Sequence, residues 1–492
     1  MAPRRGVAVG CVRWYRQDKG LVEQGLRAGR RPDMAATTAL GPLDELLALH
    51  AEVGAFAALA DVPSGRTRAG LDDALLLHTL AALPFVGNTG LRSVADQLFR
   101  DPAILLQLGW SPVQIGEGDN GRYRHAAGRQ AESLPCHPDT LRDALARIGA
   151  AAWQRVQCAG VGGLYRRRLV RGGIYAVDGT GLGAEQRVVA LVCVSGAHPL
   201  VVAWRYLEGS ASEKGKEAAV TKALIEQVLA VAGPASIDLL LADALYADGP
   251  LLAWLKCVHG IDALVRLPAD RLLYQDVQGL ATGRRLEWCE YRYIRTLHGH
   301  KQRRIVALAG AGDFESWPSF MAAAASHGRP DARLWACLVW ERAPTDQPLA
   351  EAGALVSTRA WPQPRAAFLA YRDRWVIEDE TFRELKEGWG LERAPWGARS
   401  NTLHGRVTLT LLAFNTAQLY RTQGGKRLAD KGIRRLRQLH QRDLGAAPVV
   451  LYLDDCYGVF PLEELLALLG APVRHSLRPN PRAPARLTTR SP

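Results

Sequence analysis

Two hydrophobic periods divide this chain of 492 residues, and the change between them limits the folds that it can adopt. From about 34 to 160, apolar residues recur every three or four positions, which predicts amphipathic helices. From 172 the period becomes two, and the segments 172–182, 186–196 and 198–209 predict three consecutive strands. The chain therefore combines a helical part with a part built around a sheet.

Helices and strands alternate after these three strands. The pattern predicts a helix at 213–233, a buried strand at 235–243, a helix at 247–260 and a strand at 261–268. Three strands in a row followed by such an alternation is the order of a ribonuclease H-like sheet. We therefore expect an α/β fold, a ribonuclease H-like mixed sheet flanked by helices, with an N-terminal helical domain and an inserted β-rich subdomain.

Changes of composition along the chain predict six segments. They are a basic leader at 1–33, a helical domain at 34–165, the first part of the sheet core at 170–270, a β-rich insertion at 271–345, the second part of the core at 346–425, and a C-terminal helical region with a disordered basic tail at 426–492. The leader fits a flexible DNA-contacting arm, and a start of translation at Met34 is an equal alternative. The helical domain fits a helix-turn-helix reader of DNA ends or a plain helical bundle.

Composition restricts the class of protein. The 62 Lys and Arg against 49 Asp and Glu give a net charge of +13, which suits a polyanion such as nucleic acid, although many basic proteins bind no DNA. The sequence contains no run of about 18 apolar residues, which a membrane span would need. The basic N-terminus lacks the apolar segment of a secretory signal. The eight cysteines form no CxxC pair, which indicates reduced thiols and no zinc site. We expect a cytoplasmic protein.

Two aspartates close predicted strands. Asp178 follows a strand and precedes Gly179 and Thr180, which are small enough for a phosphate backbone to approach, although an Asp before a Gly is also typical of a turn. Asp243 ends the apolar run IDLLLA, so its charge is expected at the carboxyl edge of the sheet, where active sites of open α/β sheets gather. A helix cap is the alternative there, but Asp248 fits that role better.

A third acid, Glu378, lies within a predicted long helix at 364–390. At 100° per residue, Tyr371 lies about 20° and Arg374 about 40° around the helix from Glu378, so the three share a face. An ordinary solvated Arg–Glu pair explains this face equally well, but Trp375, Phe382 and Leu385 indicate that part of the helix is packed. Three such acids suit two Mg²⁺ or Mn²⁺ ions, because hard divalent cations prefer oxygen ligands.

The segments YAVDGTGL, LLADALYAD and YRDRWVIEDETFRELKEGWGLE resemble the three acidic motifs of bacterial insertion-sequence transposases of the DDE type. The third segment is most similar to the YREK group, insertion-sequence family four, with Tyr371, Arg374, Glu378 and a downstream lysine. The β-rich insertion is a further feature of that group, and the likeness runs from about 170 to 420. It implies that Asp178, Asp243 and Glu378 catalyse DNA cleavage at terminal inverted repeats and transfer of the exposed 3′-hydroxyl.

The spacing of the lysine departs from the family pattern. The group usually has six residues between Glu and Lys, whereas seven residues, 379–385, separate Glu378 from Lys386. On a regular helix this turns Lys386 about 80° away from Glu378. Either a π-bulge restores the alignment or Arg383 takes the phosphate-binding role, and Glu380 is the rival third acid.

The resemblance also implies partners. Tyr371 and Arg374 would grip phosphates near the cut, and cations of the insertion would line the DNA path, among them Arg292, Arg295, Arg303 and Arg304; solubilising surface charge explains these cations nearly as well. We expect double-stranded DNA (terminal repeats and target) as the substrate, a homodimer that holds two ends, and a bacterial, nucleoid-associated location. The alternatives are a transposase-derived DNA-binding protein without activity and a ribonuclease H-like nuclease without strand transfer.

Overall fold

A computed structural model describes most of the chain. The described residues are 16–37, 43–66, 71–87, 90–111, 114–115, 121–123, 132–183, 185–212, 217–283, 285–297, 300–342, 348, 350–393, 396–397, 399–424, 428–441 and 448–470. The chain divides into two compact units, one formed by Met1–Gly163 with Glu384–Pro492 and the other by Leu164–Arg383. This division joins N-terminal and C-terminal segments that the sequence analysis kept apart.

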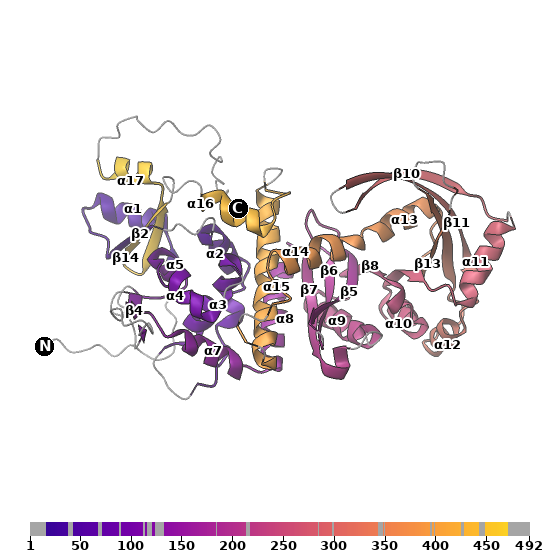
Figure 1. The fold of residues 1–492 in the computed structure, drawn as a ribbon, viewed down its shortest axis with the longest axis horizontal. Coiled ribbons are helices and arrows are strands. Elements are labelled where there is room, and N and C mark those ends of the chain that lie inside the picture. Colours follow the sequence, from indigo (N-terminus) through magenta and orange to yellow (C-terminus); the bar gives the residue numbers. More distant parts are fainter. Residues whose placement is uncertain are drawn as a thin grey trace. The chain divides into compact units, whose positions relative to one another are not determined.

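The unit Leu164–Arg383 is built on one nine-stranded mixed sheet, in the order β10-β11-β12-β13-β9-β8-β5-β6-β7 (Figure 1). The strands are β5 (Gly173–Gly183), β6 (Gln186–Cys193), β7 (Leu200–Glu208), β8 (Ile237–Ala242), β9 (Asp262–Leu267), β10 (Cys289–Leu297), β11 (His300–Phe314), β12 (Leu334–Arg342) and β13 (Ala350–Ser357). β5 to β7 confirm the three strands predicted from the period of two, and β8 and β9 confirm the two strands predicted from the alternation that follows. A large mixed sheet flanked by helices confirms the expected α/β class.

Helices pack on this sheet where the sequence places apolar stripes. They are α9 (Glu217–Ala232) against β6 and β7, α10 (Gly249–His259) against β9, α11 (Leu272–Thr282) against β11 and β12, and α12 (Pro318–Ser326) against α10. Asp248 caps α10 by accepting a hydrogen bond from the Leu251 N–H (2.7 Å), and Gly260 ends the helix in the left-handed conformation (φ 70°). The capping role expected for Asp248 is confirmed.

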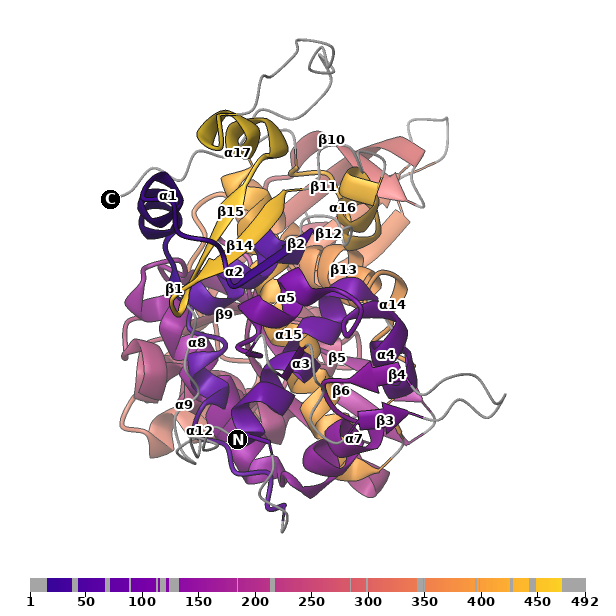
Figure 2. The ribbon, with the colours of Figure 1, turned by 90° about the vertical axis from the view of Figure 1, so that its left-hand side faces the viewer.

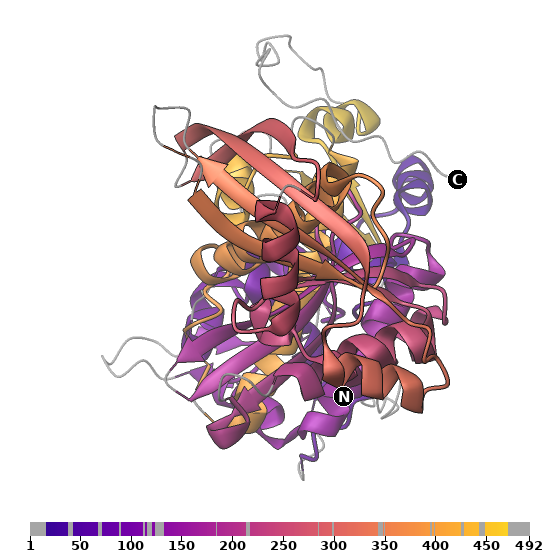
Figure 3. The same cartoon turned by 90° about the vertical axis from the view of Figure 1, so that its right-hand side faces the viewer.

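The strands after residue 289 continue the core sheet. β13 pairs antiparallel with β9, and β12, β11 and β10 follow in antiparallel order, so these four strands extend one sheet. Figure 3 shows these long strands with α11 lying across one face. The β-rich character expected for 271–345 is thus present as an extension of the sheet, reached through α11.

The helix predicted as one long element at 364–390 is interrupted. α13 (Pro364–Arg372) ends in turns, a π-helix follows at η5 (Val376–Phe382), and α14 (Arg383–Glu387) completes the run. Backbone bonds of the i→i+3 type, including Arg374 N–H to Tyr371 O (3.1 Å), tighten the chain just before the π turn widens it. The third acid therefore lies on a π turn, and a regular α-helix does not describe its orientation.

The other unit has a helical core around α15 (Ser400–Gln423), which is buried along most of its length and contacts α2 (Leu43–Glu52), α3 (Asp73–Val86) and α7 (Pro138–Arg147) (Figure 1). A side chain at Gly405 would collide with Leu145 and Trp153, so this close approach requires glycine. Its other helices are α1 (Lys19–Arg27), η1 (Ala57–Leu59), η2 (Leu91–Ser93), α4 (Val94–Gln97), α5 (Pro102–Gln107), α8 (Ala150–Arg166, which runs into the sheet unit), α16 (Ile433–Gln441) and α17 (Leu462–Leu468).

The same unit contains a four-stranded sheet of distant segments, β1 (Arg16–Gln17), β15 (Cys456–Phe460), β14 (Val449–Leu453) and β2 (Met34–Thr37) (Figure 2). Leu451 and Leu453 pack with Val22 on one face, and Val450 and Tyr452 pack with Ala103 and Leu106 on the other. Part of the basic leader is therefore packed, and the C-terminal region contains a hairpin besides its helices. A short pair, β3 (Gly121–Tyr123) and β4 (Glu132–Leu134), completes the strands. Residues 1–15 and the tail from 471 lie outside the described residues.

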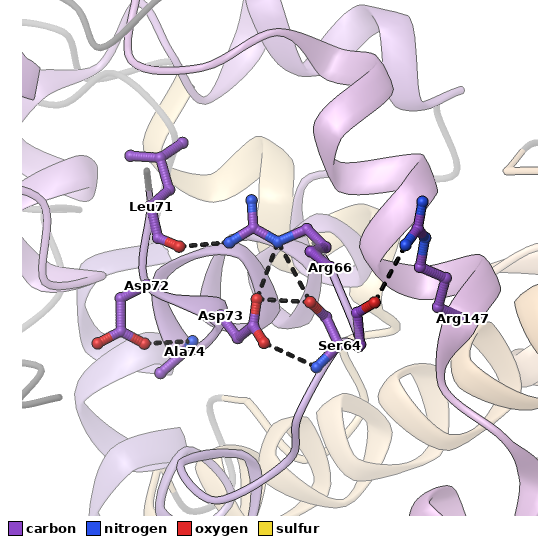
Figure 4. A network of polar contacts seen from close by, with 8 residues as sticks. Ser64, Arg66, Leu71, Asp72, Asp73, Ala74 and Arg147 are labelled. Carbon is purple, nitrogen blue, oxygen red and sulfur yellow. Dashed lines mark hydrogen bonds and ion pairs between the residues drawn. The ribbon is translucent and has the colours of Figure 1, made fainter. Parts of the chain in front are cut away.

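A polar network fixes the chain before α3 (Figure 4). Asp73 accepts hydrogen bonds from the backbone N–H (2.7 Å) and the hydroxyl (2.5 Å) of Ser64 and from Arg66 Nε (2.9 Å). Arg147 donates to the carbonyl of Gly65 (3.0 Å). Buried donors and acceptors are satisfied here within the protein, so the network serves the helix start and is structural.

No single helix among the described residues is long and apolar enough to cross a membrane; Asp73–Val86 and Leu91–Gln97, bent by 98°, meet the length and composition criteria only together. The seven described cysteines are all free, and four of them are buried.

Candidate active site

Asp178 and Asp243 lie level with each other on neighbouring parallel strands. Ala176 of β5 pairs with Leu241 of β8, an offset of 65 residues, and the same offset separates Asp178 from Asp243. β8 ends at Ala242, whereas β5 continues to Gly183 with Asp178 paired to Ala190 of β6. The expectation that Asp178 ends its strand is wrong; it lies where β5 loses its parallel neighbour.

Glu378 belongs to the same site. η5 packs against β5, and the negative charges of Glu378 and Asp243 act on Asp178. Burial and these two charges raise the pKa of Asp178 to about 7, while the Gly179 N–H and Arg374 act in the opposite direction. The structure therefore brings together the three acids chosen from the sequence. Glu380, the rival third acid, is exposed.

Two of the acids also make short local hydrogen bonds. Asp178 Oδ1 accepts from the Gly179 N–H (2.7 Å), and Asp243 Oδ1 accepts from the Leu245 N–H (2.8 Å), which caps the single turn η4 (Ala244–Tyr246). The cap considered for Asp243 is thus present beside the site role. Each bond helps to fix the direction of its side chain.

Arg374 pairs with two of the acids. Its side chain is 5% exposed, and Nη1 lies 2.5 Å from Glu378 Oε1 and 3.8 Å from Asp178 Oδ2. Burial lowers the pKa of the guanidinium, but Tyr371, Glu378 and Asp178 outweigh burial and hold this pKa above its usual value. The Arg–Glu pair expected on the helix face is present, but it is largely buried and extends to a second carboxylate.

Tyr371 and an unpredicted arginine, Arg266, border the acids. Burial raises the pKa of Tyr371, and the charges of Arg374 and Arg266 partly offset this effect. Ala242 of β8 pairs with Val265 of β9, so Arg266 is level with Asp243 on the next parallel strand. Arg266 is exposed, and its Nη2 donates to the carbonyl of Ala352 (3.1 Å). A lone cation at the end of the apolar strand IDALVRLP was the sequence signal for it.

A π turn lies between Glu378 and Lys386. In η5 the Arg383 N–H donates to the carbonyl of Glu378, five residues earlier, and the turn takes up one residue more than a regular helix. A π-bulge was one of the two alternatives given for the spacing of Lys386, the other being that Arg383 takes the phosphate-binding role. Lys386 Nζ lies 2.5 Å from Glu392 Oε1, and Arg383 is exposed.

The cations of the sheet extension divide between two faces. Ile294 pairs with Arg303 and Arg292 with Ile305, which places Arg292 and Arg303, both exposed, on one face. Tyr291, Tyr293 and Arg304 alternate with them and lie on the other. There α13 packs, with Arg365 over Tyr291 and Arg372 over Tyr293, and Arg304 pairs with Glu341 (3.8 Å). The side chain of Arg295 lies outside the described residues.

Trp389, just after α14, is 2% exposed and packs against Phe85 and Phe414, so it is a core residue. Trp375, beside Arg374, is 39% exposed.

The donor set fits a hard divalent cation. Burial is the main cause of the raised pKa of Asp178, and the charges of Glu378 and Asp243 raise it further by a repulsion that a cation would relieve. Within the described part of the chain, no three His, Cys, Asp or Glu side chains are grouped to hold one ion between them. Mg²⁺ commonly binds through one or two carboxylates, with water and substrate phosphates as the other ligands. Pairs among Asp178, Asp243 and Glu378 would therefore be sufficient ligands.

A large mixed sheet flanked by helices, with acids from two parallel strands and an interrupted helix gathered at one edge, is consistent with the class of ribonuclease H-like transposases. Residues 173–415 match the family model for the transposase DDE domain, a segment that contains all three acids. The match supports a DDE transposase and implies an enzyme of the transposase or nuclease type. No curated protein matches the chain.

Proposed function

We propose that the protein is a DNA transposase of the YREK group, which cleaves DNA at terminal inverted repeats and joins the exposed 3′-hydroxyl to target DNA. The observation that supports the proposal is that the charges of Asp243 and Glu378 both act on Asp178, although the three acids lie on β5, just after β8 and on a π turn. The match of 173–415 to the transposase DDE domain supports it further.

In this proposal the three acids hold two Mg²⁺ or Mn²⁺ ions. Such ions would stabilise charge on the phosphate oxygens and lower the pKa of the attacking hydroxyl. The chain supplies the rest of the chemistry: the Tyr371 hydroxyl and the Arg374 guanidinium donate hydrogen bonds to phosphate oxygens, and Arg383 and Lys386 add positive charge along the backbone. Local hydrogen bonds keep Asp178 and Asp243 directed before substrate arrives, which reduces the cost of reorganisation.

The proposed substrate is double-stranded DNA, first the element's ends and then the target. Exposed Arg292 and Arg303 would contact its backbone. Arg304 lies on the opposite face and pairs with Glu341, which argues against the contact expected for it, and the contact expected for Arg295 stays a prediction. A homodimer would hold both ends for coordinated cutting. The bacterial cytoplasm, at the nucleoid, is the proposed location.

The test is incubation of the full chain with DNA that carries the inverted repeats flanking its gene, in Mg²⁺ and in Ca²⁺. Joined products with Mg²⁺ support the proposal. Hydrolysis without joining indicates a ribonuclease H-like nuclease, and binding without cleavage indicates a transposase-derived DNA-binding protein. The Asp243→Asn variant is the control, because the neutral side chain keeps the size and loses the charge needed for cation binding.

A further inference from the structure

Arg374 shares its guanidinium between two acids of the site. One nitrogen, Nη1, lies 2.5 Å from Glu378 Oε1 and 3.8 Å from Asp178 Oδ2, and the side chain is 5% exposed. Within the described part of the chain, its buried Nε–H has no acceptor. The guanidinium is thus held by charge, with one donor left unsatisfied.

Aromatic rings limit where this guanidinium can go. Its central carbon lies 4.8 Å from the ring centroid of Trp375 and 5.7 Å from that of Tyr371. Cation–π contacts with these two rings allow the side chain to change its polar partner while it stays beside the site. A phosphate oxygen is a suitable new partner, because a guanidinium offers a fork of donors that includes the unsatisfied Nε–H.

We propose that Arg374 is the internal counterion of this site and competes with a divalent cation for Glu378. A substrate phosphate that attracts Arg374 then releases Glu378, which becomes able to bind the cation. The inference rests on the proposed function. Its physical basis is that Glu378 Oε1 cannot accept a short hydrogen bond from a cation and also bind a second cation without repulsion between the two positive charges. Arg374 then couples phosphate binding to cation binding, and tight cation binding is delayed until DNA is present.

The test measures Mn²⁺ binding to the full chain without DNA, by the electron paramagnetic resonance signal of free Mn²⁺. Arg374→Gln removes the competing charge and is expected to lower the Kd for Mn²⁺ by about tenfold. Arg374→Lys keeps a cation and should bind Mn²⁺ like the wild type. Arg365→Gln, in α13 and over Tyr291, is the matched control and should change nothing. A Kd in Arg374→Gln that is unchanged or higher overturns the proposal.

Two further measurements separate this inference from the proposed function. If Asp178→Asn abolishes Mn²⁺ binding while Arg374→Gln does not tighten it, the carboxylate site stands and the competition fails. If no variant binds Mn²⁺ without DNA but the wild type cleaves DNA in Mg²⁺, the inference fails and the proposed function stands; if the wild type also fails to cleave, both fail. A crystal structure of the wild type with Mn²⁺ gives an answer independent of variant folding: Arg374 Nη1 should have left hydrogen-bond range of Glu378 Oε1. A retained pair beside a bound ion contradicts the proposal.

Discussion

Asp178 and Asp243 occupy equivalent heights on adjacent parallel strands, because the β5–β8 register offset equals their separation of 65 residues. The two aspartates are therefore far apart in sequence but lie next to each other across adjacent strands of the sheet. The same reasoning extends to Arg266 on β9, which is level with Asp243. Asp178, Asp243 and Arg266 therefore form one row across the sheet, at the level of β5, β8 and β9. The π turn that contains Glu378 packs against β5.

Glu378→Gln should lower the rate of DNA strand cleavage by about a thousandfold or more, because a neutral amide is a poor ligand for a divalent cation. The measurement is single-turnover cleavage of end-containing DNA at saturating Mg²⁺. Glu380→Gln, two residues away on an exposed position, should stay within about threefold of the wild type. The assignment of the third acid is wrong if these two results are exchanged.

Thr381→Val tests the π turn. Thr381 is fully buried, and its hydroxyl donates to the carbonyl of Val376, five residues earlier (3.3 Å). Valine keeps the shape and loses the donor, so we expect a loss of about 1 kcal/mol in unfolding free energy and slower cleavage, since Glu378 lies on the same turn. Thr381→Ser keeps the hydroxyl and should cleave at nearly the wild-type rate. Equal cleavage rates in the two variants would show that the π turn does not contribute to the position of Glu378.

Glu384→Gln should destabilise the unit that contains α15. Glu384 accepts from Arg421 Nη1 (2.7 Å), the Ile433 N–H (3.2 Å) and Trp389 Nε1 (3.4 Å), and the Arg421 side chain is 5% exposed. The loss of the carboxylate charge leaves a buried guanidinium uncompensated, which costs about 3 kcal/mol. Urea unfolding measures it. Asp430→Asn, in an exposed pair with Lys431, is the control and should leave the midpoint unchanged.

His50 predicts a pH dependence of stability. Burial, with the nearby His78, lowers the pKa of His50 to about 3, and its Nδ1 lies 2.7 Å from Thr416 Oγ1. Since the unfolded value is about 6.5, the stabilisation is complete above pH 6.5 and is lost as the pH falls toward 3. Relative to His50→Gln, the wild type should lose about 1.4 kcal/mol of unfolding free energy per pH unit in that window. Urea unfolding at several pH values tests this, and parallel profiles for the two proteins would contradict it.

The central strands and helices were predictable because their signals are local. The apolar run of β8 predicts a strand that is buried on both faces, and the period of two predicts the strands β5 to β7. The continuation of β5 beyond Asp178 was not predictable, because pairing with β6 supports it and the residues DGTG resemble a turn. The second sheet was also not predictable, because β1 pairs with β15 and β2 pairs with β14 across more than 400 residues of sequence.

The acids of the site were predictable from motif resemblance, and their surroundings only in part. The interruption before Glu378 left no mark on the apolar pattern, but the extra residue before Lys386 indicated a π turn as one of two solutions. Arg266 was missed because a single cation in an apolar strand is a weak signal, and only the register of β8 with β9 gives it meaning.

The division into units has a consequence for biosynthesis. The unit Leu164–Arg383 is one uninterrupted stretch of chain, whereas its neighbour is made of segments synthesised before and after it. On the ribosome the sheet unit can fold as soon as it emerges, but α2 and α3 wait for α15 to cover their apolar residues. During that delay the N-terminal helices are exposed to aggregation and to chaperones, so slow translation between them and α15 would reduce the yield of folded protein.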